Sequence, residues 1–202
     1  MIVAVDGVDG SGKATQTKLL AKTLRATRFS FPNYESKTGE EIRAHLAKTR
    51  AWADLGNYTY AINPRSDALV FQSLQIINRL ELLPAIREAI RRGPVVFDRY
   101  WQSAYVYGGL DGIEQGWLDE VLCESIPLAD INILLDIPVE ESFRRRPDRR
   151  DHYEANREFL EKVRVEYLRL FRDRGRRENN WYIVDGTGAV PQVQERIMAI
   201  VG

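Results

Sequence analysis

A glycine-rich stretch near the start of the chain, 7-GVDGSGKATQT-17, has the composition of a phosphate-binding loop. Gly7, Gly12 and Lys13 match the pattern G-x-x-x-x-G-K-[ST], and Ala14 stands where the pattern has a hydroxyl residue. The stretch follows an apolar, strand-like run and opens a helical pattern, so its backbone N–H groups would point at an anion. Lys13 would reach the terminal phosphates of a nucleotide as a point charge. These features favour a nucleotide site over a flexible turn.

Ala14 removes the side-chain oxygen that usually contacts Mg²⁺ in such a loop. The backbone cradle remains, and Mg²⁺ keeps several waters and relies on substrate phosphates, so water can replace one ligand. Thr15 is a poor substitute, because one further residue along a helix lies about 100° around its axis. We therefore expect a working nucleotide site that still requires Mg²⁺.

Asp98 and Arg99 close a second apolar run, 95-VVFD-98. In an open α/β sheet, ligands bind at the carboxyl ends of the strands. The two charges are therefore expected beside the phosphate loop, the alternative being a surface ion pair. Asn78 and Arg79 lie among apolar residues of a helical pattern, where a half-enclosed arginine needs an anion. The alternative for Arg79 is a carboxylate partner, such as Glu81 or Glu88.

Five arginines occur within 143-FRRRPDRRDHYE-154, although the whole chain has 29 basic and 29 acidic residues. Pro147 interrupts helical continuity there. Planar guanidinium groups suit phosphoryl oxygens in a transition state. The cluster therefore favours a catalytic role over a solvated surface.

Apolar runs rich in β-branched residues alternate with helical patterns, which predicts a doubly wound, parallel α/β sheet of five strands. The strands are expected at Ile2–Asp6, Phe29–Phe31, Val95–Asp98, Ile131–Ile137 and Trp181–Asp185. Helices are expected at Thr15–Arg25, Ser66–Arg92 and Arg157–Arg174, with a kink or two helices at Pro84.

The composition narrows the class of protein. A length of 202 residues fits one domain, and the zero formal net charge gives no global attraction to nucleic acid or membrane. The single cysteine, Cys123, fits plain structure in a reducing compartment. We find no apolar run of about 18 residues and no signal pattern at the N-terminus. The expected location is the cytoplasm.

Together these motifs resemble the thymidylate kinase family of P-loop nucleoside monophosphate kinases. The matching pieces are GVDGSGKATQ, FPNYES-TG at 31–39, NR at 78–79, DRYWQS-YVYG and RRPDRRDHYE. The resemblance implies one kinase domain over residues 1–202, with a lid at about 143–154, usually assembled as a homodimer. It implies transfer of a phosphoryl group from ATP to dTMP, dependent on Mg²⁺.

The resemblance also assigns roles to residues. The residues implied for ATP are Gly7, Gly10, Ser11, Gly12, Lys13, Ala14 and Thr15. Those implied for the acceptor are Asp9, Phe31, Pro32, Tyr34, Gln75, Arg79, Arg99, Ser103, Tyr107 and Tyr153. Asp98, Asp9 and Glu154 are implied near the metal, with Asp98 acting through water. The implied catalytic residues are Lys13, Asp98, Arg99, Arg145 and Arg149.

Within this family, the chain resembles the type whose catalytic arginines lie in the lid, since Gly10 and Ser11 are not basic. Spacing favours Arg145 and Arg149 over Arg144, Arg146 and Arg150. The chain also departs from the family at the base pocket. Gln75 replaces an aromatic residue that stacks on thymine, and Ala104 replaces a polar one.

These departures leave alternatives open. Another pyrimidine deoxynucleoside monophosphate, such as dUMP or a 5-substituted relative, is a possible acceptor, and a non-catalytic nucleotide sensor is a further alternative. A switch GTPase is disfavoured because the chain has no N-K-x-D motif. A nucleoside kinase is disfavoured because its acceptor has no use for Arg79 and Arg99 together.

Overall fold

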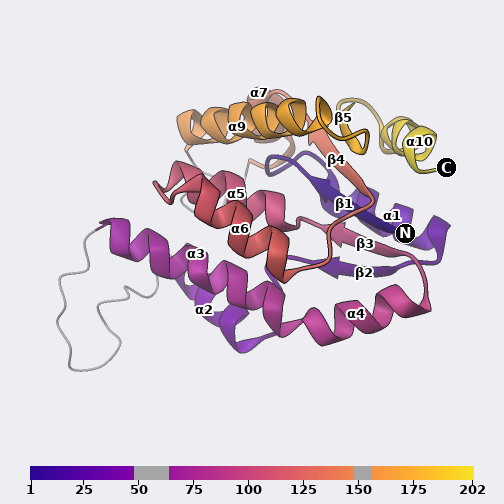
Figure 1. Cartoon of the computed structure of the whole chain (residues 1–202). Helices are drawn as coiled ribbons and strands as arrows, with labels where there is room; N and C mark the ends of the chain where they lie inside the picture. The colour runs from indigo at the N-terminus through magenta and orange to yellow at the C-terminus, as the bar shows by residue number, and fades with distance from the viewer. Residues whose placement is uncertain (48–63, 148–155) are drawn as a thin grey trace.

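One parallel sheet forms the centre of the molecule (Figure 1). The computed structural model describes residues 1–47, 64–147 and 156–202. The strands are β1 (Ile2–Asp6), β2 (Thr27–Ser30), β3 (Val95–Asp98), β4 (Ile131–Asp136) and β5 (Trp181–Asp185). They lie in the order β2-β3-β1-β4-β5. The prediction of a doubly wound, five-stranded parallel sheet is confirmed, although β2 begins and ends earlier than the expected Phe29–Phe31.

The described helices cover both faces of the sheet. They are α1 (Lys13–Leu24), α2 (Lys37–Leu46), α3 (Pro64–Glu81), α4 (Leu83–Arg92), α5 (Trp101–Leu110), α6 (Gln115–Ser125), α7 (Val139–Arg145), α9 (Arg157–Gly175) and α10 (Val190–Val201). The expected break at Pro84 is confirmed, because α3 ends at Glu81 and Pro84 lies in the first turn of α4. None of the described helices is long and apolar enough to cross a membrane.

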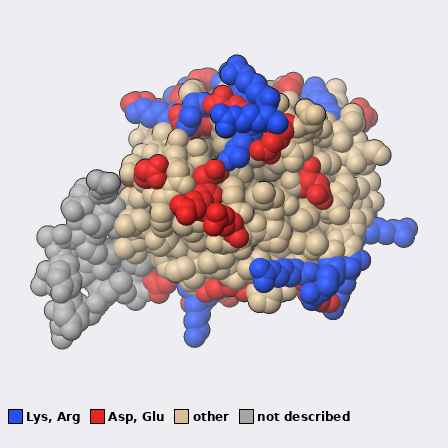
Figure 2. All heavy atoms as spheres, viewed as in Figure 1, with Lys and Arg blue, Asp and Glu red and all other residues tan. Residues whose placement is uncertain are grey.

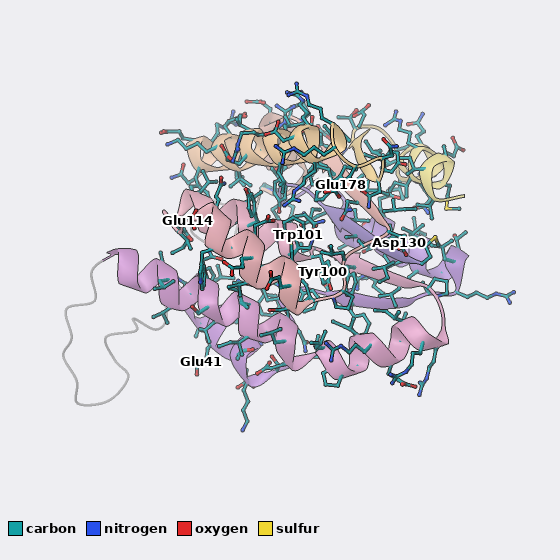
Figure 3. The ribbon with its side chains drawn as sticks, in the orientation of Figure 1. Glu41, Tyr100, Trp101, Glu114, Asp130 and Glu178 are labelled. Carbon is teal, nitrogen blue, oxygen red and sulfur yellow. The ribbon has the colours of Figure 1, made fainter. Side chains whose placement is uncertain are left out.

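Apolar clusters fix the helices on both faces of the sheet. On one face, Val5 and Val96 pack with Leu20 of α1 and Ile197 of α10. On the other face, α4, α5 and α6 cover β1 and β3, and Tyr100 stacks on Phe97 with ring centroids 3.9 Å apart. Figure 3 shows Tyr100 between this helical layer and the sheet. Both faces of β1 and β3 are buried, which explains why these strands are continuous apolar runs.

Several of the described helices were not predicted from the sequence. α2, α5, α6, α7 and α10 were not expected, and side-chain caps begin two of them, α2 and α6. The Glu114 side chain caps α6 by accepting hydrogen bonds from the backbone N–H groups of Gly116 and Trp117 (Figure 3). The Ser36 hydroxyl caps α2 by accepting from Gly39.

Candidate active site

A cavity of about 970 Å³ opens at the carboxyl ends of β2 and β3, and we call it the central cavity. Its walls come from the loop after β1 and from α1, α2, α3, α5, α7 and α10. Six basic and two acidic residues line it: Lys13, Arg43, Arg79, Arg99, Arg145 and Arg146, with Asp9 and Asp98. A chain without net charge thus concentrates positive charge in one place, which suits a ligand with several phosphates.

The loop between β1 and α1 has a backbone that favours glycine. Gly10 and Gly12 have φ of 78° and 95°, in the left-handed region. Gly7 has φ of 148°, and a Cβ there would lie 2.5 Å from the Leu135 carbonyl oxygen. Gly12 is the N-cap of α1, so the first turn of the helix follows the loop directly. The predicted strand–loop–helix arrangement is confirmed.

Lys13 is buried at the start of α1, where its Nζ donates to the Val8 carbonyl at 2.8 Å. Burial, together with the charge of Arg99, lowers the pKa of Lys13 to about 8, against the opposing effect of Asp9 and Asp98. A desolvated ammonium group beside the loop is a strong partner for an incoming anion.

Asp98 ends β3 and lines the central cavity. Its Oδ2 accepts from Arg28 Nη2 and from Ser30 Oγ, the latter at 3.5 Å. Among the described residues, Oδ1 has no hydrogen-bond partner. By contrast, the Asp9 carboxylate pairs with Arg146 and lies 3.7 Å from Arg99.

The donor set of the central cavity fits Mg²⁺ held mainly by phosphates and water. Within the described ranges, no three His, Cys, Asp or Glu side chains cluster closely enough to hold a metal by themselves. One accessible carboxylate oxygen on Asp98 is the sort of protein ligand that Mg²⁺ uses in nucleotide sites. Glu154, the third expected metal residue, lies outside the described residues.

Arg99 connects the phosphate loop to α5. Its φ is 61°, unusual for a residue with a side chain and frequent where function constrains the backbone. Nη1 donates to Ser103 Oγ at 3.4 Å and to the Gly7 carbonyl at 3.5 Å. Ser103 in turn donates to Asp6 at 2.6 Å and lies 2.8 Å from the Tyr167 hydroxyl. This buried network fixes the guanidinium at the wall of the cavity.

A pocket at the far end of the central cavity is formed by the segment after β2, together with α3 and α5. Phe31, Pro32, Tyr34, Gln75 and Tyr107 line it, as expected for the acceptor, and so does Ala104. Arg79 lies at its base with its guanidinium carbon 5.1 Å from the Phe31 ring centroid. Arg79 donates to the carbonyl oxygens of Tyr100 and Gln75, which fixes the orientation of its guanidinium beside the cavity.

The alternative that Arg79 pairs with Glu81 or Glu88 is wrong, since neither carboxylate is paired with it. Glu81 accepts from Thr38, and Glu88 pairs with Arg91 and Arg92. The neighbouring residue Asn78 has a different role. Its side chain accepts from the Asn33 backbone N–H at 2.7 Å and so holds the segment after β2 against α3.

The arginine-rich segment begins in α7. Arg145 extends into the central cavity, where Nη2 donates to the Gly186 carbonyl at 3.1 Å and Nη1 lies 3.4 Å from the Gly10 carbonyl. Arg144 is exposed and pairs with Glu141. Arg146, which spacing disfavoured, also lines the cavity. Arg149, Arg150, Tyr153 and Glu154 lie outside the described residues.

Several residues that line the cavity or contact its lining residues were not predicted from the sequence. Arg28 and Tyr167 gave no local signal, because their partners are far away along the chain. Asp6 ends β1 as Asp98 ends β3, and this shared position at the carboxyl end of a strand could have indicated that Asp6 lies near the site. Burial raises the pKa of the Asp6 carboxyl. The loop after β5, with Gly186 and Gly188, also lines the cavity and carried a glycine signal.

Comparisons with known proteins agree on one family. The family model described as thymidylate kinase matches residues 5–197. The thymidylate kinase of Thermosipho melanesiensis is 32% identical, over 100% of this chain and 97% of its own length. The probable thymidylate kinase of Pyrococcus abyssi is also 32% identical, over 98% of this chain and 94% of its own.

Solved structures support the same fold. A thymidylate kinase from Candida albicans superposes with a TM-score of 0.77 at 22% identity, covering 99% of this chain and 90% of its own. The thymidylate kinase from Ehrlichia chaffeensis superposes with a TM-score of 0.70 at 20% identity, covering 100% of this chain and 97% of its own.

Proposed function

Because the chain belongs to the thymidylate kinase family, we propose that it transfers the terminal phosphoryl group of ATP to dTMP, forming ADP and dTDP. The observation that carries this proposal is the central cavity itself. The glycine-rich loop lies at one end, the pocket of Phe31, Pro32 and Tyr34 at the other, and basic side chains from separate elements line the same cavity. Residues 1–202 would act as a single domain.

The phosphate loop would bind ATP. The backbone of Gly7, Gly10, Ser11 and Gly12 would surround its phosphates, and Ala14 and Thr15 begin the helix whose N-terminus faces them. Lys13 would leave its hydrogen bond with Val8 and bind the terminal phosphates. The loop after β5 lies beside this end of the cavity and would contact the rest of the donor nucleotide.

The pocket of Phe31, Pro32 and Tyr34 would bind dTMP. Arg99 would hold its phosphate, and Arg79 would add charge at the base of the same pocket. Ser103 and Tyr107 would line the sugar, and Asp9 would face its 3′-hydroxyl. Tyr153 would close the site from the lid segment, 143–154.

A phosphate oxygen of dTMP would attack the γ-phosphorus of ATP as the bond to the leaving ADP oxygen breaks. Such a transfer needs no side-chain nucleophile, because positioning and charge stabilisation carry most of the catalysis. Lys13 and Arg145, and Arg149 by resemblance, would stabilise the charge that spreads over the transferred group. Bound Mg²⁺ would neutralise charge on the phosphates, with Asp98 as its protein ligand through water, and Asp9 and Glu154 nearby.

The family match favours dTMP over the other acceptors considered, and an enzyme over a nucleotide sensor. A sensor also has no use for an arginine placed at the phosphate loop, as Arg145 is. Since ATP and deoxynucleotides occur in the cytoplasm and the single cysteine suits a reducing compartment, the cytoplasm is the proposed location.

A homodimer would bury the exposed apolar face of α3. Leu69, Val70, Ile77 and Leu80 are all exposed on this helix. Figure 2 shows few charged side chains over α3, while acidic side chains gather over the neighbouring α6. Light scattering should give a dimer for the wild type and a monomer for Ile77→Glu, and a wild-type monomer would contradict this assembly.

The kinase proposal is tested by measuring ADP release with each deoxynucleoside monophosphate in turn, with and without Mg²⁺. We expect the highest kcat/KM with dTMP and no turnover in Lys13→Ala, which loses the charge aimed at the moving phosphate. Circular dichroism should show Lys13→Ala folded. Equal turnover of wild type and Lys13→Ala would overturn the assignment of the phosphate loop.

A further inference from the structure

Arg28, a residue of the edge strand β2, lies at the junction of three elements. Its Nη2 donates to Asp98 Oδ2 at the end of β3, and its Nε donates to Thr17 Oγ1 in α1 at 2.9 Å. The Arg28 side chain is 23% exposed and the Asp98 side chain 8% exposed, so solvent screens this ion pair only in part. One guanidinium therefore connects β2, β3 and the helix that begins at the phosphate loop.

The sheet register makes this contact possible. Ser30 lies directly opposite Asp98, and Arg28 lies two residues earlier on the same face of β2. Arg28 and Asp98 are therefore diagonal neighbours, a separation that long side chains can span. Both oxygen contacts from β2, the hydroxyl of Ser30 and the guanidinium of Arg28, go to Oδ2. They leave Oδ1 without a hydrogen-bond partner among the described residues, on a side chain that lines the central cavity.

The same contacts reach the residue that lacks the usual hydroxyl. Thr17 Oγ1 accepts from Arg28 and donates to the Ala14 carbonyl oxygen at 3.4 Å. A chain of hydrogen bonds thus runs from Ala14 through Thr17 and Arg28 to Asp98. The carboxylate that faces the metal is held in a fixed position relative to the first turn of α1, where the hydroxyl is missing.

A competing partner for Asp98 lies nearby. The Asp98 charge acts on Lys13 and raises its pKa, which places the two groups within electrostatic reach. A buried carboxylate without Arg28 would gain most by turning toward Lys13. That movement would withdraw Asp98 from the metal and Lys13 from the phosphates.

We propose that Arg28 is a positioning residue that fixes Asp98 for Mg²⁺ and so compensates for the missing hydroxyl at Ala14. The inference rests on the proposed kinase function. Outer contacts that orient a metal-facing group typically change metal affinity by about 10- to 100-fold when they are removed. The relevant quantity is the gain in ADP affinity when Mg²⁺ is added, because this gain isolates the metal coupling from any change in metal-free ADP affinity that Lys13 causes.

The experiment measures ADP affinity by titration calorimetry with Mg²⁺ and with EDTA, in wild type, Arg28→Leu, Arg28→Lys and Thr17→Val. Arg28→Leu should lose about 10-fold or more of the gain that Mg²⁺ gives. Arg28→Lys keeps a charge near Asp98 but cannot contact Thr17 at the same time. It should therefore show only part of the wild-type gain in ADP affinity with Mg²⁺. Thr17→Val keeps the ion pair between Arg28 and Asp98, so it should lose less of the Mg²⁺-dependent gain than Arg28→Leu does. Lys22→Leu, an exposed change in α1, is the matched control and should behave as wild type.

Two results would overturn the positioning role: an unchanged or larger Mg²⁺-dependent gain in a folded Arg28→Leu variant, or full recovery in Arg28→Lys. If Arg28→Leu does not fold, a wild-type Mg²⁺-dependent gain in both Arg28→Lys and Thr17→Val would also overturn the positioning role. A wild type that binds no ADP at all would instead contradict the proposed kinase function. Thermal melting of each variant separates loss of stability from loss of metal coupling.

Discussion

The guanidinium of Arg145 donates to the Gly186 carbonyl oxygen at 3.1 Å, which joins α7 to the loop after β5. The same side chain reaches Gly10 of the phosphate loop and is paired to Glu141 at 2.6 Å. Under the proposed kinase function, a cation held between these two loops would stabilise the charge that develops on the transferred phosphoryl group.

Arg145→Met should therefore lower kcat by about 100-fold or more while changing the KM for ATP only a few-fold. Arg144→Met is the matched control, because Arg144 pairs with the same Glu141 but points to solvent. Steady-state kinetics of the two variants check this. A change in KM alone for Arg145→Met, or equal effects in both variants, would contradict a role in the transition state.

Lys13 should give nucleotide binding a distinct pH dependence. Its pKa is lowered from 10.5 to about 8, so much of it is neutral at pH 8.5 in the free protein. Bound phosphates favour the charged form and raise this pKa, so ADP binding should be accompanied by net proton uptake at pH 8.5. Calorimetry in two buffers of different ionisation enthalpy measures this uptake, and Lys13→Met should abolish it.

The same shift affects stability. Since the folded pKa of Lys13 lies below the unfolded value, the unfolded chain binds more protons between about pH 8 and 10.5. Lys13 therefore makes the wild type gain stability, relative to Lys13→Met, as the pH rises through this window. Denaturant unfolding at pH 7.5 and pH 10 tests the sign, and a gain toward lower pH would contradict the lowered pKa.

Arg99 should act on the acceptor and not on ATP. Arg99→Met removes a charged hydrogen-bond donor that is already held in place by Ser103 and the Gly7 carbonyl. The affinity for dTMP should fall by about 2–3 kcal/mol, with ADP affinity unchanged. Separate titrations with dTMP and ADP measure both. A loss confined to ADP would show that Arg99 serves the donor nucleotide.

The sequence was sufficient for the features whose signals are local. β1, β3 and β5 have the expected bounds because buried strands give continuous apolar runs, and the phosphate loop has a fixed spacing. It was insufficient for Arg28 and Tyr167, which contact the site across the sheet from distant parts of the chain. The helix α5 was missed because its apolar residues, buried on most sides, give no amphipathic pattern. Spacing did not single out Arg146, which lines the cavity, because spacing cannot say which way a side chain turns beyond the end of α7.

Ala14 should leave the Mg²⁺ requirement intact. Its missing hydroxyl removes one ligand, which water replaces, while phosphates and Asp98 provide the rest. Activity should therefore vanish in excess chelator, and Ala14→Ser should change the Mg²⁺ concentration for half-maximal activity only a few-fold. The KM for dTMP should not change. Undiminished turnover in chelator would contradict a metal-dependent site.

Gln75 should set the strength of base recognition. It lines the acceptor pocket one turn before Arg79, which donates to its backbone carbonyl, and so it lies about 6 Å along the helix from the residue at the base of the pocket. The neighbouring aromatic ring, Phe71, is stacked on His45 with centroids 4.3 Å apart, so at least one of its faces is already covered.

An amide at position 75 provides less stacking on a pyrimidine than a ring, and stacking is worth roughly 1–3 kcal/mol per base at nucleic-acid sites. Gln75→Phe should therefore tighten dTMP binding by about 5-fold or more, with ADP affinity unchanged. Gln75→Leu is the control, because it removes the amide without adding a ring and should not tighten binding. If both variants instead lose dTMP affinity, the Gln75 amide reads a polar edge of the base, and stacking is not what this pocket lacks.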